Sequence, residues 1–165
     1  MHDHPMAPEL NTRKNDTYHH GVIGNGRSCA VIDWDATIVF SCLPDFDSGT
    51  VFASLLDDER GGRMGVELVG GGAVGQSYER TTNILVTEFR SHDGESAIRV
   101  IDFMPRYTWD GKAGASGDAP SDIVRVIEPV KGSPEIRVHY DPKIEYGRFD
   151  TVSVATTDTQ IKSST

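Results

Sequence analysis

The chain has 165 residues, the length of one domain, and its 16 Lys and Arg against 25 Asp and Glu give a formal net charge of −9. Because no run of Lys or Arg is present to neutralise phosphates, the sequence predicts no nucleic-acid partner and no anionic membrane surface. No apolar stretch reaches the about 18 residues of a membrane span, and the N-terminus lacks the pattern of a secretory signal. We therefore expect a soluble, cytoplasmic protein whose partners are neutral or cationic ligands or another protein surface.

The chain divides into a tail and one domain. Residues 1–17 hold prolines, histidines and scattered charges without periodicity, which indicates a flexible N-terminal tail. Residues 18–165 change to short runs of Val, Ile and Phe punctuated by Gly, Asp-Gly and Pro, the pattern of strands and tight turns. This second part is the predicted β-sandwich domain, with a truncated C-terminal end kept as an alternative. Its expected strands span residues 28–32, 37–42, 63–68, 83–90, 96–103, 123–130 and 135–140, with a weaker one at 151–155.

Two hairpins are predicted from their turn sequences. The first turns through residues 92–94, where Asp93-Gly94 supplies the positive-φ positions that such turns require. The second turns through residues 131–134 and joins the predicted strands 123–130 and 135–140.

The last of these strands alternates apolar and polar side chains. Ile136, Val138 and Tyr140 alternate with Arg137 and His139, so we expect the apolar face to be buried and the polar face to be wet. Such alternation is typical of antiparallel sheet.

One helix is expected near residues 48–57. Ser48 is a good N-cap, and Phe52, Leu55 and Leu56 share one helical face before the glycines that follow Arg60. The predicted fold class is therefore all-β: an antiparallel, supersandwich-like β-sandwich with this one short helix.

Cysteine and histidine give no sign of a metal or cofactor. Cys29 and Cys42 flank apolar runs, where Cys usually behaves as a small buried hydrophobe, and we expect both thiols to be reduced. A disulfide is the alternative if their segments pair as a hairpin. No C-x2-C spacing is present, and adjacent histidines such as His19 and His20 point to opposite faces of a strand, so no metal site and no cofactor are expected.

Paired carboxylates are plentiful, but their contexts favour structure over catalysis. Asp33 and Asp35 flank Trp34 in a predicted turn, Asp47 precedes the expected helix cap, and residues 57–59 are expected to be solvated. No Ser-His-Asp or Cys-His arrangement can be singled out by spacing.

Exposed aromatic side chains would serve for stacking on sugar rings. The candidates are Trp34, Tyr107 and Trp109, and Trp109 is favoured because it opens a glycine-rich loop. Neighbours such as Asn25, Arg27 or Asp47 would then bind sugar hydroxyls, whereas we expect Phe46 to lie in the core.

Several motifs occur in a characteristic order along the chain. They are residues 23–32 (IGNGRSCAVI), 42–48 (CLPDFDS), 51–62 (VFASLLDDERGG), Tyr78 with 82–85 (TNIL), 100–105 (VIDFMP), and 140–142 (YDP) with 146–148 (YGR). In this order they resemble the N-terminal β-sandwich domain of bacterial and archaeal glycoside hydrolase family 15 proteins, the glucoamylase and trehalase-like group.

The resemblance implies a sandwich that leads into and packs against an (α/α) barrel. In this family two glutamates of the barrel act as general acid and base in an inverting hydrolysis of α-glucosidic bonds. It therefore implies that no residue of this chain is catalytic, and that the sandwich continues beyond residue 165 and leaves a strand edge open. The expected role is a module that supports and positions the barrel, in cis or in trans, with α-glucans or trehalose as ligands. The alternative is a stand-alone carbohydrate-binding or protein-interaction sandwich.

Two positions depart from the family pattern. Residues 36–40 replace a glycine turn followed by Ser-Ile-Asp-Trp, and Asp45 stands where the family commonly has arginine. These departures suggest altered contacts with a barrel. Because polar loop residues beside strands often serve contacts, the interdomain or ligand-face candidates are Asn25, Arg27, Pro44, Phe46 and Asp47.

Overall fold

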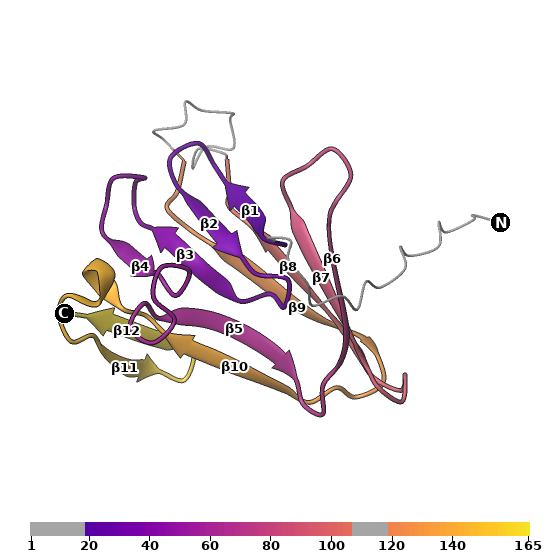
Figure 1. The fold of residues 1–165 in the computed structure, drawn as a ribbon. Coiled ribbons are helices and arrows are strands. Elements are labelled where there is room, and N and C mark those ends of the chain that lie inside the picture. Colours follow the sequence, from indigo (N-terminus) through magenta and orange to yellow (C-terminus); the bar gives the residue numbers. More distant parts are fainter. Residues whose placement is uncertain (1–18, 107–118) are drawn as a thin grey trace.

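The computed structural model describes residues 19–106 and 119–165 of the chain, and Figure 1 shows its course. The predicted tail of residues 1–17 lies outside the described residues. The elements in chain order are β1 (Gly21–Gly24), β2 (Cys29–Ile32), β3 (Ile38–Cys42), β4 (Thr50–Phe52), β5 (Arg63–Leu68), β6 (Gly72–Tyr78), β7 (Leu85–Ser91), β8 (Ala97–Phe103), β9 (Val124–Lys131), β10 (Ile136–Asp141), the short 3-10 turn η2 (Ile144–Gly147), β11 (Val152–Thr157) and β12 (Gln160–Ser164).

The strands form two facing sheets and a separate hairpin (Figure 1). The six-stranded sheet has the order β1-β2-β3-β5-β10, with β4 paired to β3, and the four-stranded sheet has the order β6-β7-β8-β9. Strands β11 and β12 pair only with each other. Every pairing is antiparallel, so the predicted all-β antiparallel sandwich is confirmed.

The core lies between the sheets in two apolar clusters. The first contains Ile23, Ala30, Ile32, Ile38 and Phe52 of the six-stranded sheet with Leu85 and Met104. The second contains Ala36, Val66 and Leu68 with Phe89, Ile98 and Val100 of the four-stranded sheet. Burying each large aliphatic side chain contributes about 1.5–3 kcal/mol, so these clusters are the main force that holds the sheets together.

A buried ion pair joins the two sheets beside the second cluster. Arg125 of β9 donates from Nε to Asp102 Oδ1 at 2.7 Å and from Nη2 to Asp102 Oδ2 at 3.0 Å. Nη2 also donates to the carbonyl oxygen of Ala36 at 2.7 Å, and Nη1 to that of Met64 at 3.4 Å. The Asp102 and Arg125 side chains are 0% and 5% exposed, so four hydrogen bonds compensate the burial of both charges.

The predicted helix near residues 48–57 is wrong. Thr50–Phe52 forms β4, which pairs with β3 through Ser41↔Phe52 and Cys42↔Thr50, and turns follow it. Ser48 Oγ accepts the amide of Asp45, so this residue closes a turn and caps no helix. Phe52 is buried in the first core cluster, where sheet pairing and packing override the local helical pattern.

Of the two predicted hairpins, one is confirmed and one is wrong. Strands β7 and β8 turn through Gly94, which has φ 72°, and the amide of Ser91 donates to the carbonyl of Ser96. Strands β9 and β10 do not pair: β9 pairs with β8, and β10 pairs with β5 in the other sheet. The turn at residues 131–134 thus carries the chain from one sheet to the other.

The sequence patterns of β1, β6 and β12 did not predict strands. β6 reads GAVGQSY, in which two glycines and three polar side chains hide the alternation, yet it pairs with β7 along its whole length.

Among the described residues, no helix has both the length and the apolar character needed to cross a membrane.

Candidate functional site

The candidate residue Asn25 organises the turn between β1 and β2. Its side chain is buried, and Oδ1 accepts the amides of Arg27 at 2.9 Å and Ser28 at 3.0 Å. Nδ2 donates to the carbonyl of Pro120 at 2.8 Å. All these partners belong to the domain itself, so Asn25 holds the turn together.

The candidate Arg27 binds Asp45 across two loops. Arg27 Nε lies 2.5 Å from Asp45 Oδ1, and Nη1 donates to the carbonyl of Ala119 at 3.3 Å. This hydrogen bond lowers the pKa of the Asp45 carboxyl and raises the pKa of Arg27. Asp45, which stands where the resemblance implies arginine, therefore joins the β3–β4 loop to the β1–β2 turn.

The other candidates of the β3–β4 loop face solvent. Phe46 is 59% exposed, which corrects the expectation that it lies in the core, and its amide donates to the carbonyl of Arg27 at 3.1 Å. Pro44 and Asp47 are exposed in the same loop. The structure thus brings Arg27, Asp45 and Phe46 together, on a surface that can contact a partner.

Of the predicted sugar-stacking residues, the structure describes Trp34. It is 45% exposed and lies in the β2–β3 turn, at the opposite end of β2 from Asn25 and Arg27. Tyr107 and Trp109 lie outside the described residues.

No metal site is formed by the part of the chain that the structure describes, because its His, Cys, Asp and Glu side chains make no suitable group of three. Both cysteines are free, as expected, with Cys42 buried and Cys29 half-buried. Burial raises the pKa of both thiols, which favours the unreactive protonated form.

The inner face of β10, formed by Ile136, Val138 and Tyr140, is an exposed apolar surface and is called the β10 face below. These residues pair with Leu68, Val66 and Met64 of β5, so they continue the core side of the six-stranded sheet. They are nevertheless 36%, 51% and 36% exposed, which corrects the prediction that this face is buried.

The β10 face is open because the four-stranded sheet ends at β9 and does not extend over it. Tyr140 packs edge-on against the Phe52 ring at 6.1 Å, and its hydroxyl lies 3.3 Å from Ser163 Oγ of the β11–β12 hairpin. On that hairpin Val152, Val154 and Ile161 are also exposed.

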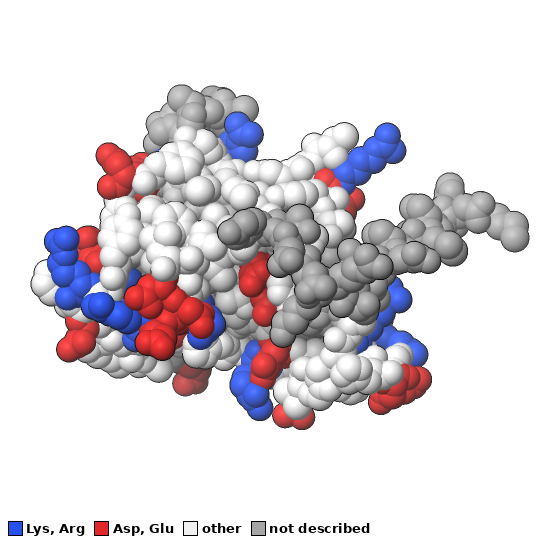
Figure 2. Space-filling view, viewed as in Figure 1, with Lys and Arg blue, Asp and Glu red and all other residues white. Residues whose placement is uncertain are grey.

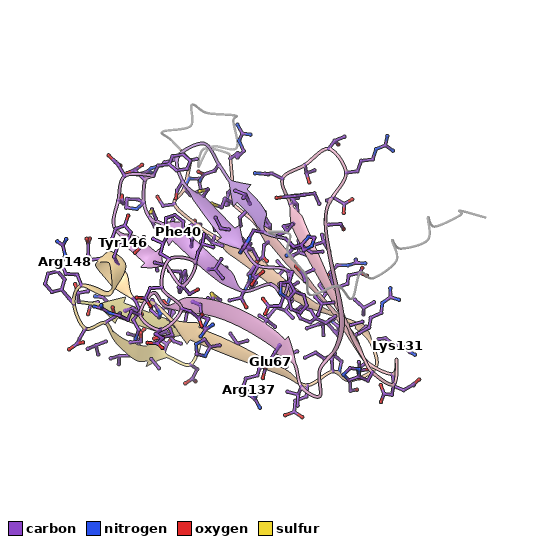
Figure 3. All side chains as sticks on the ribbon, viewed as in Figure 1. Phe40, Glu67, Lys131, Arg137, Tyr146 and Arg148 are labelled. Atoms are coloured by element: carbon purple, nitrogen blue, oxygen red, sulfur yellow. The ribbon has the colours of Figure 1, made fainter. Side chains whose placement is uncertain are left out.

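The outer face of β10 is polar, as its alternation predicts. Figure 3 shows Arg137 beside Glu67 of β5, with which it forms an ion pair. Complete burial of the exposed fractions of the three side chains of the β10 face would stabilise the protein by roughly 2–4 kcal/mol more, because a fully buried aliphatic side chain contributes about 1.5–3 kcal/mol.

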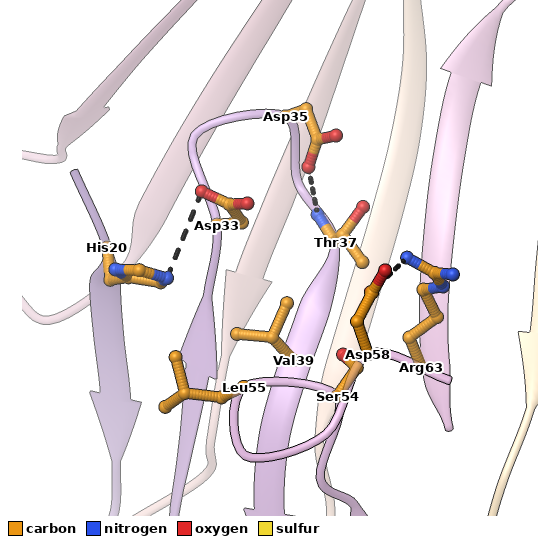
Figure 4. Close-up of a pocket in the computed structure, with 9 residues that line it drawn as sticks. All are labelled: His20, Asp33, Asp35, Thr37, Val39, Ser54, Leu55, Asp58 and Arg63. Atoms are coloured by element: carbon orange, nitrogen blue, oxygen red, sulfur yellow. Dashed lines mark hydrogen bonds and ion pairs between the residues drawn. The ribbon is translucent and has the colours of Figure 1, made fainter. Parts of the chain in front are cut away.

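A pocket of about 250 Å³ opens at the other side of the six-stranded sheet (Figure 4). It is lined by His20, Asp33, Asp35, Thr37, Val39, Ser54, Leu55, Asp58 and Arg63. These residues come from the position just before β1, the β2–β3 turn, β3, the β4–β5 loop and β5. Figure 2 shows acidic side chains gathered over the β4–β5 loop with basic side chains beside them.

Hydrogen bonds fix the carboxylates of this pocket. Asp33 Oδ1 accepts the amide of Trp34 at 2.7 Å, and Asp35 Oδ1 accepts the amide of Thr37 at 3.1 Å, so both aspartates serve the turn as predicted. His20 Nε2 lies 4.0 Å from Asp33 Oδ1.

The β4–β5 loop closes the opposite side of the pocket. Asp58 Oδ1 accepts a hydrogen bond from Arg63 Nη1 at 2.9 Å. Among the buried side-chain oxygens and nitrogens of the described residues, only Ser54 Oγ lacks a hydrogen-bond partner.

Comparison with known proteins identifies relatives that cover between 52% and 79% of the chain. The trehalase of Thermoplasma volcanium is 33% identical over 132 residues, covering 79% of this chain and 20% of the trehalase. The trehalase of Thermoplasma acidophilum is 33% identical over 121 residues, covering 70% and 18%, and trehalase 1 of Sulfolobus acidocaldarius is 40% identical over 85 residues, covering 52% and 14%.

The chain therefore spans about a fifth or less of the length of the curated relatives that it matches. No solved structure matches it significantly. The family described as "Trehalase-like, N-terminal" matches residues 12–164. Because this match covers nearly the whole sequence, the chain belongs to the trehalase-like N-terminal domain family.

Proposed function

We propose that this chain is the non-catalytic N-terminal β-sandwich of a family 15 α-glucoside hydrolase of the glucoamylase or trehalase type. In this proposal it supports and positions a catalytic (α/α) barrel, and hydrolysis of trehalose or α-glucans is the work of that barrel. The observation that carries the proposal is the β10 face, an apolar continuation of the core whose three side chains stay 36–51% exposed in the described structure.

The position of the β10 face suits a docking role. Strand β10 is an edge of the six-stranded sheet, so it presents both an apolar face and an open backbone edge to a partner. Isolated exposed apolar side chains are ordinary, but a row of three on the core side of a sheet marks an interaction surface. The relatives are trehalases about five times longer than the matched region, which supports a partner within the same polypeptide.

A chimera tests the proposal. The 165-residue chain would replace the matching N-terminal segment of the Thermoplasma volcanium trehalase, and glucose release from trehalose would be measured together with the melting temperature. Val138→Asp places a charge on the β10 face, whereas His139→Asp, the matched control, places it on the polar face. We expect Val138→Asp to lower the melting temperature and the activity, at roughly 2–4 °C per kcal/mol lost, and His139→Asp to leave both near those of the parent chimera.

Equal effects of the two substitutions in the chimera would contradict docking through this face. Both variants would also be melted as the isolated chain, where Val138 is already half-exposed and only a small loss is expected. Hydrolysis of trehalose, maltose or dextrin by the isolated chain would overturn the non-catalytic role.

A protein-interaction role in trans is the second candidate, and it rests on the same face. It predicts that the isolated chain associates with itself or with a separate subunit at high concentration. If the isolated chain sediments as a monomer under those conditions, association in trans is excluded and the arrangement within one polypeptide is favoured.

A further inference from the structure

We propose that the pocket between the β2–β3 turn and the β4–β5 loop binds one neutral, hydroxyl-rich ligand of the size of a single sugar ring. The proposal does not depend on a catalytic partner, because all the groups that it uses belong to this chain. It also lies apart from the loop around Arg27 and Asp45, neither of which lines the pocket.

The size of the pocket limits the ligand. Its volume of about 250 Å³ lies below the roughly 300–1,000 Å³ of sites for drug-sized molecules. At about 30 Å³ per water molecule in the liquid, it corresponds to roughly eight waters, which suits one six-membered ring with its hydroxyl groups.

The lining groups match a ligand that both donates and accepts hydrogen bonds. Asp33 and Asp35 supply carboxylate oxygens that accept from hydroxyl groups, and Arg63 supplies N–H donors. Val39 and Leu55 add an apolar wall for the C–H face of a ring. Carboxylates, a guanidinium and an aliphatic wall together suit a sugar better than they suit an apolar molecule.

Two of the three carboxylates already face a basic side chain. Asp58 pairs with Arg63 at 2.9 Å, and Asp33 lies 4.0 Å from His20 Nε2. An uncharged hydroxyl is compatible with both signs of charge in this lining. Three carboxylates against one guanidinium leave the lining net negative, so an organic cation is the competing ligand, and putrescine tests for it.

Ser54 gives a second, independent indication of a ligand. Its side chain is 8% exposed and its hydroxyl has no hydrogen-bond partner. Figure 4 shows the Ser54 side chain among the residues that line the pocket. An unpaired buried polar group costs about 1–3 kcal/mol, and a ligand hydroxyl would remove that cost.

Two neighbours of Ser54 in the pocket lining are largely exposed. Leu55 is 44% exposed, and the Asp58 side chain is 77% exposed. Since the Ser54 hydroxyl is itself buried, the proposed contact requires side chains of this lining to move. The opposite wall is fixed, because the amide of Asp33 donates to the carbonyl of Thr37 at 2.7 Å and holds the β2–β3 turn.

Trp34 lies in the same turn, between the two aspartates, with 45% of its surface exposed. Trp34 is not among the residues that line the pocket, and its stacking role stays a prediction.

The test is a titration of the 15N-labelled 165-residue chain with glucose and trehalose, with putrescine as a cationic probe. We expect saturable amide shifts with a sugar, confined to residues 33–39 and 54–63, and a Kd on the order of millimolar. Asp33→Asn/Asp35→Asn keeps the hydrogen bonds of the turn but removes both charges, and should weaken sugar binding about tenfold. Asp158→Asn, in the β11–β12 turn, is the matched control and should bind like the parent.

Ser54→Ala separates binding from folding. It removes a buried hydroxyl that has no partner, so it should unfold at an equal or higher urea concentration while binding sugar several-fold more weakly. The absence of sugar-induced shifts, shifts elsewhere in the chain, preferential binding of putrescine, or unchanged sugar affinity in Ser54→Ala and in the double variant would each overturn the proposal.

Discussion

Removal of Arg125 is the sharpest test of how the two sheets are held together. Arg125→Leu deletes the donors of four hydrogen bonds and leaves the Asp102 carboxylate fully buried without a counter-charge. Breaking a buried ion pair from one side typically costs about 3–5 kcal/mol. Since domains of this kind are stable by about 5–15 kcal/mol, we expect a large shift in the urea unfolding midpoint.

The double variant Asp102→Leu/Arg125→Leu is the control. It replaces both charges by apolar side chains, so it should be destabilised less than Arg125→Leu even though it carries one more substitution. Burial raises the pKa of the Asp102 carboxyl, and the hydrogen bonds from Arg125 oppose that rise. Without Arg125 the folded-state pKa stands further above the unfolded value.

The loss caused by Arg125→Leu should therefore be largest near neutral pH and should shrink as acid protonates the buried carboxyl. Urea unfolding at several pH values, followed by circular dichroism, measures both effects. A cost below about 1 kcal/mol at neutral pH, or a double variant less stable than the single one, would refute the reasoning.

Two further predictions concern the loops. The hydrogen bond from Arg27 lowers the pKa of the Asp45 carboxyl from its ordinary value. The pair therefore contributes stability above that ordinary pKa, and the contribution is lost as the pH falls through the folded-state pKa. Asp45→Asn should accordingly flatten the acid limb of a melting-temperature profile, and an unchanged limb would exclude this pair as a cause. Gly72 has φ 154°, and a Cβ there would lie 1.8 Å from the carbonyl oxygen of Arg90, so Gly72→Ala should disrupt the β6–β7 pairing. Gly70→Ala, with φ 89° and open space around it, should cost only about 1–2 kcal/mol in the same unfolding assay.

Turn chemistry predicts the β7–β8 hairpin because Gly94 adopts the positive φ that its sequence signals. The same reasoning fails for β9 and β10, where the residues of the turn carry no information about the partner strand. Strand β10 pairs with β5, about 70 residues earlier, and such long-range register is set by the packing of both sheets. Strand β4 was hidden for a similar reason, since three residues are too few to show an alternation.

The candidate sites show the same contrast between local sequence patterns, which can be recognised, and long-range contacts, which cannot. The importance of Asn25 and Arg27 could be predicted from a motif, but their role in holding loops together becomes evident only when their partners are known. The pocket combines His20, the β2–β3 turn and the β4–β5 loop, which no local pattern connects. The alternation in β10 correctly predicts an apolar face. Whether a second layer covers that face depends on where the four-stranded sheet ends, which the sequence of β10 does not show.

We propose that the β10 face is the surface on which the rest of a longer enzyme docks. The decisive measurement is hydrogen–deuterium exchange of residues 136–141, compared between the isolated chain and the trehalase chimera. We expect slower exchange of these amides in the chimera, while the β7–β8 turn at residues 92–94 exchanges equally fast in both proteins. Identical exchange of residues 136–141 in the two proteins would be incompatible with docking through this face.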